Sequence, residues 1–346
     1  MNQSLRACLV LITISMIVVF SQTASGEDAV FSADGKTIYI VPLFGTSPDK
    51  LQAVSLTVGE VTAIEIPEGP GPISKVARTK DGRILCMSSV AVHAWRPTTG
   101  EVERISEAGE SSQFLDMTYD PVSGVVVFQR EQSGRQPYWT QSWGARKVPE
   151  RTSMKMLPAN GIPHGTELRG MAFDPEGSFF FGCDGDLWHG DFRDVEYPSG
   201  GELYSYRYAP LAGRSSSGGG SVAQMGVKSI VAAGPWLYIH NYRMGGTGWG
   251  EVIRIAKPEV KAKPNGTRDY PSPEFGEIAA VYKRALESST VLGKNDSSTP
   301  CLAASPDGSL VYFQAETQGE MAHWLVRNHG VPERLAIRDK TQESEK

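Results

Sequence analysis

A hairpin pattern that recurs along the chain is the feature that most limits how this sequence can fold. Its clearest copy is CLAASPDGSLVYFQAE, residues 301–316, in which two short apolar runs flank Asp307-Gly308. An Asp-Gly pair supplies the positive φ angles of a tight turn, and the alternating apolar residues beside it fit half-buried strands. The segment therefore predicts two antiparallel strands joined by a tight turn.

The same pattern occurs five more times. Asp-Gly occupies the turn in two of these copies, Asp-Pro followed by a glycine in two others, and Gly-Pro in the weakest one. In chain order, the copies cover residues 31–41, 77–87, 118–129, 171–182 and 230–240. Looser hairpins lie between them, at residues 51–66, 90–105 and 322–337. Each unit therefore predicts four antiparallel strands in roughly 40 to 55 residues, the size of a β-propeller blade.

The predicted fold class is thus all-β, a β-propeller of four-stranded antiparallel blades. One such sheet cannot cover both of its apolar faces, whereas a closed ring of sheets can. A β-sandwich is the alternative, but it would not place the same hairpin in every unit. The six hairpins predict six blades. A seventh blade stays open as an alternative, because the interval from Gly234 to Gly308 is longer than the others.

Two of the hairpins carry a recognisable repeat. SADGKTIYIV, within residues 32–41, and SPDGSLVYF, within residues 305–313, resemble the SPDG-type repeats of TolB-like, YVTN-type and WD-like β-propellers. The Asp-Pro turns at Asp120 and Asp174 are more similar to those of lactonase-like and NHL-like propellers. The resemblance implies an architecture only, since propellers have many unrelated functions.

Residues 1–26 have the pattern of a secretory signal peptide, with Arg6, an apolar run at residues 7–20 and small residues at 24–26. The run has about 14 residues, fewer than the roughly 20 of a bilayer span. An uncleaved anchor is the alternative. The pattern predicts a secreted or periplasmic protein with no transmembrane segment after cleavage. The propeller domain is predicted at 27–338 and a polar tail at 339–346.

Residues 258–297 are predicted to form a loop and helix insertion within the propeller domain. In residues 277–289, five side chains lie on one face of a 3.6-residue period and predict a short helix: Ile278, Val281, Tyr282, Ala285 and Leu286. The glycine-rich and serine-rich segment at 213–226 predicts a second long loop.

The charge and the cysteines narrow the function classes. The formal charge of −5 becomes −6 on removal of residues 1–26, because Arg6 is the one charged residue in that segment. This balance argues against nucleic acid as a partner, since binding it requires a basic surface. Of the three cysteines that remain, Cys86 and Cys301 lie in predicted strands and are expected to be buried free thiols. One disulfide among Cys86, Cys183 and Cys301 is the alternative.

Propeller geometry predicts the position of a site. The ends of the second strands and the loops between blades share one face, so residues distant in sequence meet at one end of the central channel. Loops on a rigid scaffold commonly hold binding residues. The predicted ligand-binding residues on this face are Arg130, Glu131, Asp184, Asp186, His240, Asn241, Arg243, Glu316 and His164. Arg169 and Lys228 are expected in loops between blades beside them.

These residues carry both signs of charge, which suits a polar ligand. The leading hypothesis is an exported, non-enzymatic propeller that binds a protein or carbohydrate partner on this face. One alternative is a hydrolase or lyase of the lactonase-like type, with a divalent cation as Lewis acid. Four aspartates are candidate oxygen donors for such a cation, although solvated turn residues are the simpler interpretation: Asp184, Asp186, Asp191 and Asp194. A structural envelope protein is the third hypothesis.

Overall fold

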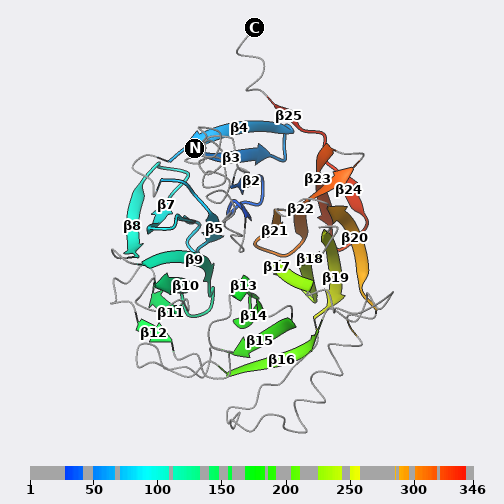
Figure 1. Ribbon diagram of the computed structural model, residues 1–346. Coiled ribbons are helices and arrows are strands. Elements are labelled where there is room, and N and C mark those ends of the chain that lie inside the picture. The colour runs from blue at the N-terminus through cyan, green and yellow to red at the C-terminus, as the bar shows by residue number, and fades with distance from the viewer. Residues whose placement is uncertain are drawn as a thin grey trace, which may run out of the picture.

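The structure is a computed structural model in which the strands and most of the short turns are described (Figure 1). The described residues are 28–41, 50–66, 71–108, 112–132, 140–147, 155–157, 168–183, 186–191, 204–210, 225–243, 250–257, 285, 288–295, 301–317 and 320–339. All statements below on the structure refer to this part of the chain.

The described strands form six sheets, each of which contains four consecutive antiparallel strands, and we number these sheets as blades 1 to 6. Blade 1 contains β1 (Ala29–Phe31), β2 (Thr37–Ile40), β3 (Lys50–Ser55) and β4 (Glu60–Glu65). Blade 2 contains β5 (Lys75–Arg78), β6 (Ile84–Met87), β7 (Ala91–Trp95) and β8 (Val102–Glu107). Blade 3 contains β9 (Ser112–Tyr119), β10 (Val125–Gln132), β11 (Thr140–Lys147) and β12 (Lys155–Leu157).

The second half of the chain repeats this plan. Blade 4 contains β13 (Leu168–Phe173), β14 (Ser178–Cys183), β15 (Asp186–Asp191) and β16 (Tyr204–Pro210). Blade 5 contains β17 (Met225–Ala233), β18 (Trp236–Arg243), β19 (Gly250–Ala256) and β20 (Thr290–Asn295). Blade 6 contains β21 (Leu302–Ala304), β22 (Leu310–Thr317), β23 (Glu320–Arg327) and β24 (Pro332–Arg334).

The first strands of the blades surround a central axis. Going round, β1 contacts β5, β5 contacts β9, β9 contacts β13, β13 contacts β17, β17 contacts β21, and β21 returns to β1. Figure 1 shows the blades arranged radially about this circle, with the fourth strands outermost. This closed arrangement is that of a β-propeller, as the repeats predict, and the alternative of a β-sandwich is wrong.

Apolar cores fill the spaces between neighbouring blades. Phe31 and Ile38 of blade 1, for example, pack with Tyr312 and Leu325 of blade 6, and all four side chains are buried. Equivalent clusters join blades 1 and 2, 2 and 3, 4 and 5, and 5 and 6. The core between blades 6 and 1 joins the last blade to the first, so burial of apolar surface closes the ring.

Side chains hold the turn of the first hairpin in blades 1, 2 and 6. The hydroxyls of Ser32, Thr79 and Ser305 donate to the aspartate two residues later, over 2.6, 2.5 and 2.6 Å. The glycine that follows has a positive φ and donates its N–H to the carbonyl of the same serine or threonine. These bonds are the reason for the recurring Asp-Gly pattern, because they satisfy the polar groups of a tight turn locally.

A short C-terminal strand completes blade 1. In β25 (Arg338–Asp339), the chain pairs in parallel with β4 as a fifth strand (Figure 1). Leu335 and Ile337, just before it, pack against the core between blades 6 and 1. Asp339 thus belongs to a strand, while the rest of the predicted tail lies outside the described residues.

Gly59 is expected to be critical for this C-terminal contact. It has φ +68°, and a Cβ there would lie 2.7 Å from the carbonyl oxygen of Ala336, which precedes β25. Gly100 occupies the corresponding turn of blade 2 with φ +76° and open space around it. We expect Gly100→Ala to cost about 1 kcal/mol through backbone strain alone. Gly59→Ala should cost about 1 to 2 kcal/mol more. Equal losses in urea unfolding of the two variants would contradict this account.

The structure also describes two of the cysteines and part of the segment predicted as an insertion. Cys86 and Cys301 are free and buried, as expected, so the alternative of a disulfide among the three cysteines is wrong. The last residues of the predicted insertion, 290–295, form β20. The predicted helix at 277–289 lies outside the described residues except for 285, 288 and 289. Of these, Ala285 is helical and packs against the core between blades 4 and 5.

Candidate functional site

Six residues at equivalent positions, in or directly before the first strands, define what we call the inner ring. Each lies four residues before the residue at which the turn of the first hairpin begins, as Asp28 does before Ser32 and Lys75 before Thr79. The six positions are therefore at one level of the channel. In blade order, the inner ring consists of Asp28, Lys75, Asp116, Gly170, Ser229 and Cys301. Five side chains with polar groups and a glycine occupy positions that face the interior of an otherwise apolar fold, a placement that needs a physical reason.

An ion pair connects the first two members. The Lys75 Nζ lies 2.7 Å from the Asp28 Oδ1, with the lysine side chain fully buried and 22% of the aspartate side chain exposed. Burial raises the pKa of the Asp28 carboxyl, and the positive charges of Lys75 and Lys228 oppose this effect. Two ammonium groups from blades 2 and 5 therefore act on one carboxylate of blade 1, which is possible only because the ring is closed.

Asp116 connects blades 3 and 4. Its Oδ1 accepts the backbone N–H of Met117 at 2.8 Å, and the backbone N–H of Met171 also bonds to the carboxyl. Burial raises its pKa well above the ordinary value, although Lys75 and these N–H groups lower it and Asp28 raises it further. Asp116 is thus electrostatically coupled to the Asp28–Lys75 pair across the channel.

Gly170 allows the first strands of blades 4 and 5 to approach each other closely. A Cβ at this position, where φ is +60°, would lie 2.8 Å from the Cα and 2.9 Å from the backbone nitrogen of Ser229. No side chain fits in that space. The glycine therefore determines how closely the inner ring closes on this side.

Lys228 and His240 extend the inner ring in blade 5. The pairing of β17 with β18 shifts between Val227 and Ser229, which places Lys228 at a bulge and Ser229 opposite His240. Both side chains are buried, with exposures of 5% for Lys228 and 0% for His240. Burial, together with the charge of Lys228, lowers the pKa of His240 to about 3, so the imidazole is neutral at physiological pH.

Several buried polar atoms at this level have no hydrogen-bond partner within the described structure. They are the Asp116 Oδ2, the Ser229 Oγ, both ring nitrogens of His240 and the Gln314 Oε1. Gln314 lies opposite Cys301, because its N–H donates to the Cys301 carbonyl. An unpaired buried polar atom costs about 1 to 3 kcal/mol, so such atoms rarely gather without a role.

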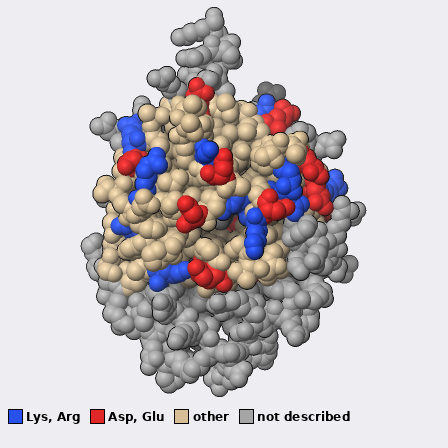
Figure 2. Space-filling model, turned by 180° about the vertical axis from the view of Figure 1, so that it is seen from behind, with Lys and Arg blue, Asp and Glu red and all other residues tan. Residues whose placement is uncertain are grey.

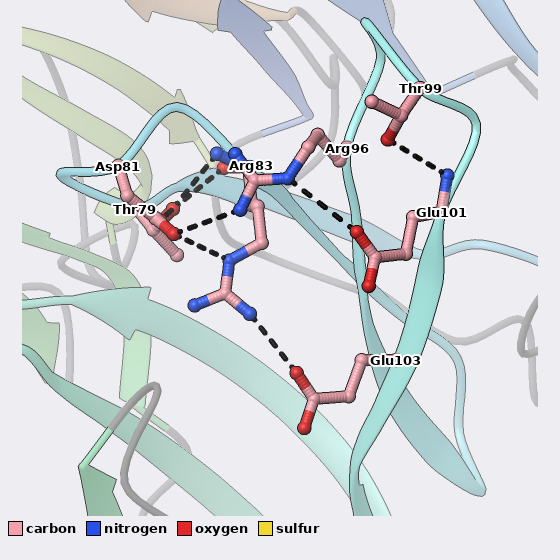
Figure 3. A network of polar contacts seen from close by, with 7 residues as sticks. All are labelled: Thr79, Asp81, Arg83, Arg96, Thr99, Glu101 and Glu103. Atoms are coloured by element: carbon pink, nitrogen blue, oxygen red, sulfur yellow. Dashed lines mark hydrogen bonds and ion pairs between the residues drawn. The ribbon is translucent and has the colours of Figure 1, made fainter.

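The face at the first-hairpin turns has a different character. Figure 3 shows seven residues of blade 2 there, in which charged groups are satisfied by one another. Arg83 lies 2.8 Å from Asp81 and 3.1 Å from Glu103, and Arg96 lies 3.4 Å from Asp81. These ion pairs connect turns of one blade, so we interpret them as scaffold.

The predicted site residues lie on or near the second strands, just past the level of the inner ring. Arg130 directly follows Gln129, which pairs with Asp116, and Asn241 directly follows His240. Glu131 in β10, Arg243 in β18 and Glu316 in β22 continue the same strands, and Asp186 begins β15. Among the predicted site residues, the structure describes the side chain of His240 alone. Asp184 and His164 lie outside the described residues.

Two other expectations for this face need correction. Arg169 and Lys228 lie in strands β13 and β17, not in loops between blades. The bulge in each of these strands explains the difference, because both segments continue the sheet pairing past an irregular residue. The correction moves Lys228 from the rim into the inner ring region.

Surface charge is mixed where it is described. Figure 2, seen from behind, shows Lys and Arg side chains next to Asp and Glu side chains, with no large area of one sign among the coloured residues. Among the described residues there is also no group of three or more His, Cys, Asp or Glu side chains arranged to hold a metal ion. No helix in this part of the chain is long and apolar enough to span a membrane.

Solved structures with the same architecture are found at low sequence identity. TolB from Acinetobacter baumannii is 13% identical with a TM-score of 0.50, over 95% of this chain and 69% of TolB. The protein thus has the β-propeller fold that TolB also has. A gluconolactonase from Xanthomonas campestris is 11% identical with a TM-score of 0.50, over 84% of this chain and 83% of that enzyme.

An oligogalacturonate lyase in complex with manganese is also similar. It is 11% identical with a TM-score of 0.50, over 91% of this chain and 78% of the lyase. At these identities the similarity concerns the fold alone. No protein-family model matches the sequence, and no curated protein matches it significantly.

Sequence reasoning overlooked most of the inner ring. The available signal was an acidic or basic residue four positions before the turn, as in KVART at 75–79 and DMTYD at 116–120. Each charge interrupts an apolar strand, and comparing the repeats position by position would have brought Asp28, Lys75 and Asp116 together.

Proposed function

We propose that this protein is an exported, non-enzymatic propeller of six blades that binds a protein or carbohydrate partner at the mouth of its channel. The supporting observation is the inner ring, where charged and unpaired polar groups from separate blades meet at one level. A polar site formed by residues far apart in sequence is typical of ligand binding on a rigid scaffold.

The rim above the inner ring provides the outer contacts in this proposal. Sheet pairing holds the backbones of four rim residues, which lie in the C-terminal halves of the second strands of three blades: Arg130, Asn241, Arg243 and Glu316. Asp184, Asp186, Glu131 and His164 complete the proposed rim. Export is supported by the signal-peptide pattern of residues 1–26.

Variants of the rim test this function. Binding of the purified protein is measured on arrays of oligosaccharides and of peptides, for the wild type, Arg243→Glu and Asp184→Lys. We expect both variants to lose at least ten-fold in binding while the melting temperature stays within about 2 °C, because rim charges contribute little to stability. Lys36→Glu, at an exposed turn on the opposite face, is the matched control.

Each outcome bears on the proposal. If the rim variants melt early, those residues are scaffold and the rim is misassigned. If the wild type shows no saturable binding on either array, the structural envelope hypothesis is favoured instead.

A metal-assisted hydrolase or lyase is the second candidate. The unpaired nitrogens of His240 and Oδ2 of Asp116 are groups that can ligate a divalent cation. The ammonium group of Lys75 acts on Asp116 and that of Lys228 acts on His240, and both would repel a bound cation. For this reason we prefer the binding function. Metal analysis of the purified protein distinguishes the two: a stoichiometric cation whose chelation lowers the melting temperature would favour the enzyme.

A further inference from the structure

A chain of hydrogen bonds runs through blade 6 beside the inner ring. The Gln314 Nε2 lies 3.1 Å from the Tyr312 hydroxyl oxygen, which lies 2.6 Å from the Nδ1 of His323. Tyr312 and Gln314 alternate along β22, and His323 lies opposite Gln314 in β23, so the three side chains share one face of the sheet. Tyr312 is fully buried, Gln314 is 5% exposed and His323 is partly buried. The chain therefore connects a partly exposed imidazole to a buried amide at the level of the inner ring.

The number of protons determines the direction of each bond. The NH2 group of Gln314 donates to the Tyr312 oxygen. The Tyr312 hydroxyl has a single proton of its own, which it can therefore give to the Nδ1 of His323, and the neutral imidazole carries its proton on Nε2. The Gln314 Oε1 points away from Tyr312, which explains why this buried atom has no hydrogen-bond partner among the described residues.

The surroundings of His323 leave its charge state to this chain of bonds. Burial alone lowers the pKa of His323 to about 4, with no contribution from a charged residue in the described part of the protein. Glu333 and Arg334 of β24 lie opposite the two residues that follow His323, and Glu333 is 3.3 Å from Arg327. On the blade 1 side, the same face of the sheet packs against apolar side chains. The group that responds first to protonation of the ring is therefore the Tyr312 hydroxyl.

We infer that His323 sets which polar group Gln314 presents at the inner ring: its oxygen while the imidazole is neutral, and its NH2 group once the imidazole is protonated. Protonation places a proton from solvent on Nδ1, which then donates to the Tyr312 oxygen. The Tyr312 hydroxyl now needs another acceptor for its own proton, because an unpaired buried donor is costly. The Gln314 oxygen becomes that acceptor when the amide rotates by half a turn.

The inner ring thereby exchanges a hydrogen-bond acceptor for a donor. The backbone does not need to move, since the Gln314 N–H is held by the Cys301 carbonyl at 3.1 Å. A partly buried histidine that reverses a hydrogen-bond network on protonation is a simple pH-dependent device. This inference concerns the polarity of the inner ring and does not depend on the partner that the rim binds.

Nuclear magnetic resonance of the isotope-labelled protein tests the inference. At pH 7 we expect the imidazole proton of His323 on Nε2 and an Overhauser contact between the NH2 group of Gln314 and the ring of Tyr312. This contact should disappear as the pH is lowered, with the midpoint of the His323 titration at about 4. Gln314→Met identifies the amide signals, and circular dichroism checks that the fold persists at each pH.

Two variants test the same chain of bonds at pH 7. His323→Leu removes the acceptor, so the Tyr312 hydroxyl donates to the Gln314 oxygen and the Overhauser contact should be absent without acid. Tyr312→Phe removes the connection, so His323 still titrates while the Gln314 amide signals no longer follow it. His329→Asn is the control, because His329 also faces a tyrosine hydroxyl, that of Tyr238 at 3.1 Å, and its replacement should change neither readout. Asparagine suits the φ of 59° at this position.

Three results would overturn the inference. The first is an imidazole proton on the Nδ1 of His323 at pH 7, which reverses every bond of the chain. The second is an Overhauser contact between Gln314 and Tyr312 that persists in His323→Leu. The third is a Gln314 response to pH in Tyr312→Phe equal to that of the wild type. If the protein unfolds before His323 titrates, the imidazole tautomer and the His323→Leu variant at pH 7 decide the question.

Discussion

Lys75→Met is expected to lower the free energy of unfolding by about 3 kcal/mol, near the lower end of the range for removal of one partner from a buried ion pair. The lysine side chain is fully buried and its Nζ lies 2.7 Å from the Asp28 carboxylate. Methionine fills a similar volume, so the loss reflects the charge more than packing. Lys228 also acts on Asp28 and limits the damage, which places the effect at the low end. Equilibrium urea unfolding at pH 7 measures it.

Lys50→Met is the matched control for this experiment. Lys50 lies 3.7 Å from Glu65, and both side chains are exposed, at 38% and 72%. Exposed pairs contribute about 0 to 1 kcal/mol. A loss for Lys75→Met as small as that for Lys50→Met would show that Asp28 and Lys75 do not meet in a buried site.

Acidification is expected to destabilise the protein through His240. Its pKa is about 3 in the folded protein, below the ordinary value of 6.5, because burial disfavours the charged ring. Between these two pH values the unfolded state binds the proton and the folded state does not, so stability is highest above pH 6.5 and decreases as pH falls. The slope approaches about 1.4 kcal/mol per pH unit. His323, with a pKa lowered to about 4 by burial, acts in the same direction.

Asp28 and Asp116 titrate in the opposite sense, because burial raises the pKa of both and they favour the folded state as pH falls. Comparison of the wild type with His240→Leu isolates the contribution of His240 from theirs. The free energy of unfolding of His240→Leu, relative to that of the wild type, should rise by about 2 kcal/mol when the pH is lowered from 7 to 5. His329→Leu is the control, because His329 is only partly buried and its pKa is lowered by burial and by the charge of Arg254. Parallel pH curves for the wild type and His240→Leu would contradict the buried, unpaired position of this ring.

The fold could be predicted because the signals for it are local. Each Asp-Gly or Asp-Pro turn specifies a hairpin from a few adjacent residues, and the regular recurrence of the hairpin specifies the ring. The parallel pairing of β25 with β4 could not be predicted this way. It joins residues 338–339 to 60–61, and a two-residue strand has no periodicity to detect.

The site was harder to predict for a physical reason. Rim residues such as Arg243 stand out in the sequence because they lie at the ends of apolar strands, whereas Lys75 and Asp116 lie within strands and resemble interruptions. Their meaning depends on which strands become neighbours around the axis, which only the closed ring decides. His240 was selected as a residue after a second strand, but its complete burial depends on tertiary packing and has no sequence signature.

A double-mutant cycle on Asp28 and Lys75 tests the inner ring most directly, because it measures the energy between two residues that are 47 positions apart in the sequence. Urea unfolding of the wild type, Asp28→Asn, Lys75→Met and the double variant gives the coupling. A coupling of about 1.5 to 3 kcal/mol is predicted, since a buried pair shares its free energy. Losses that add to within about 0.5 kcal/mol would show that the two side chains do not meet, and the account of the inner ring would then be wrong.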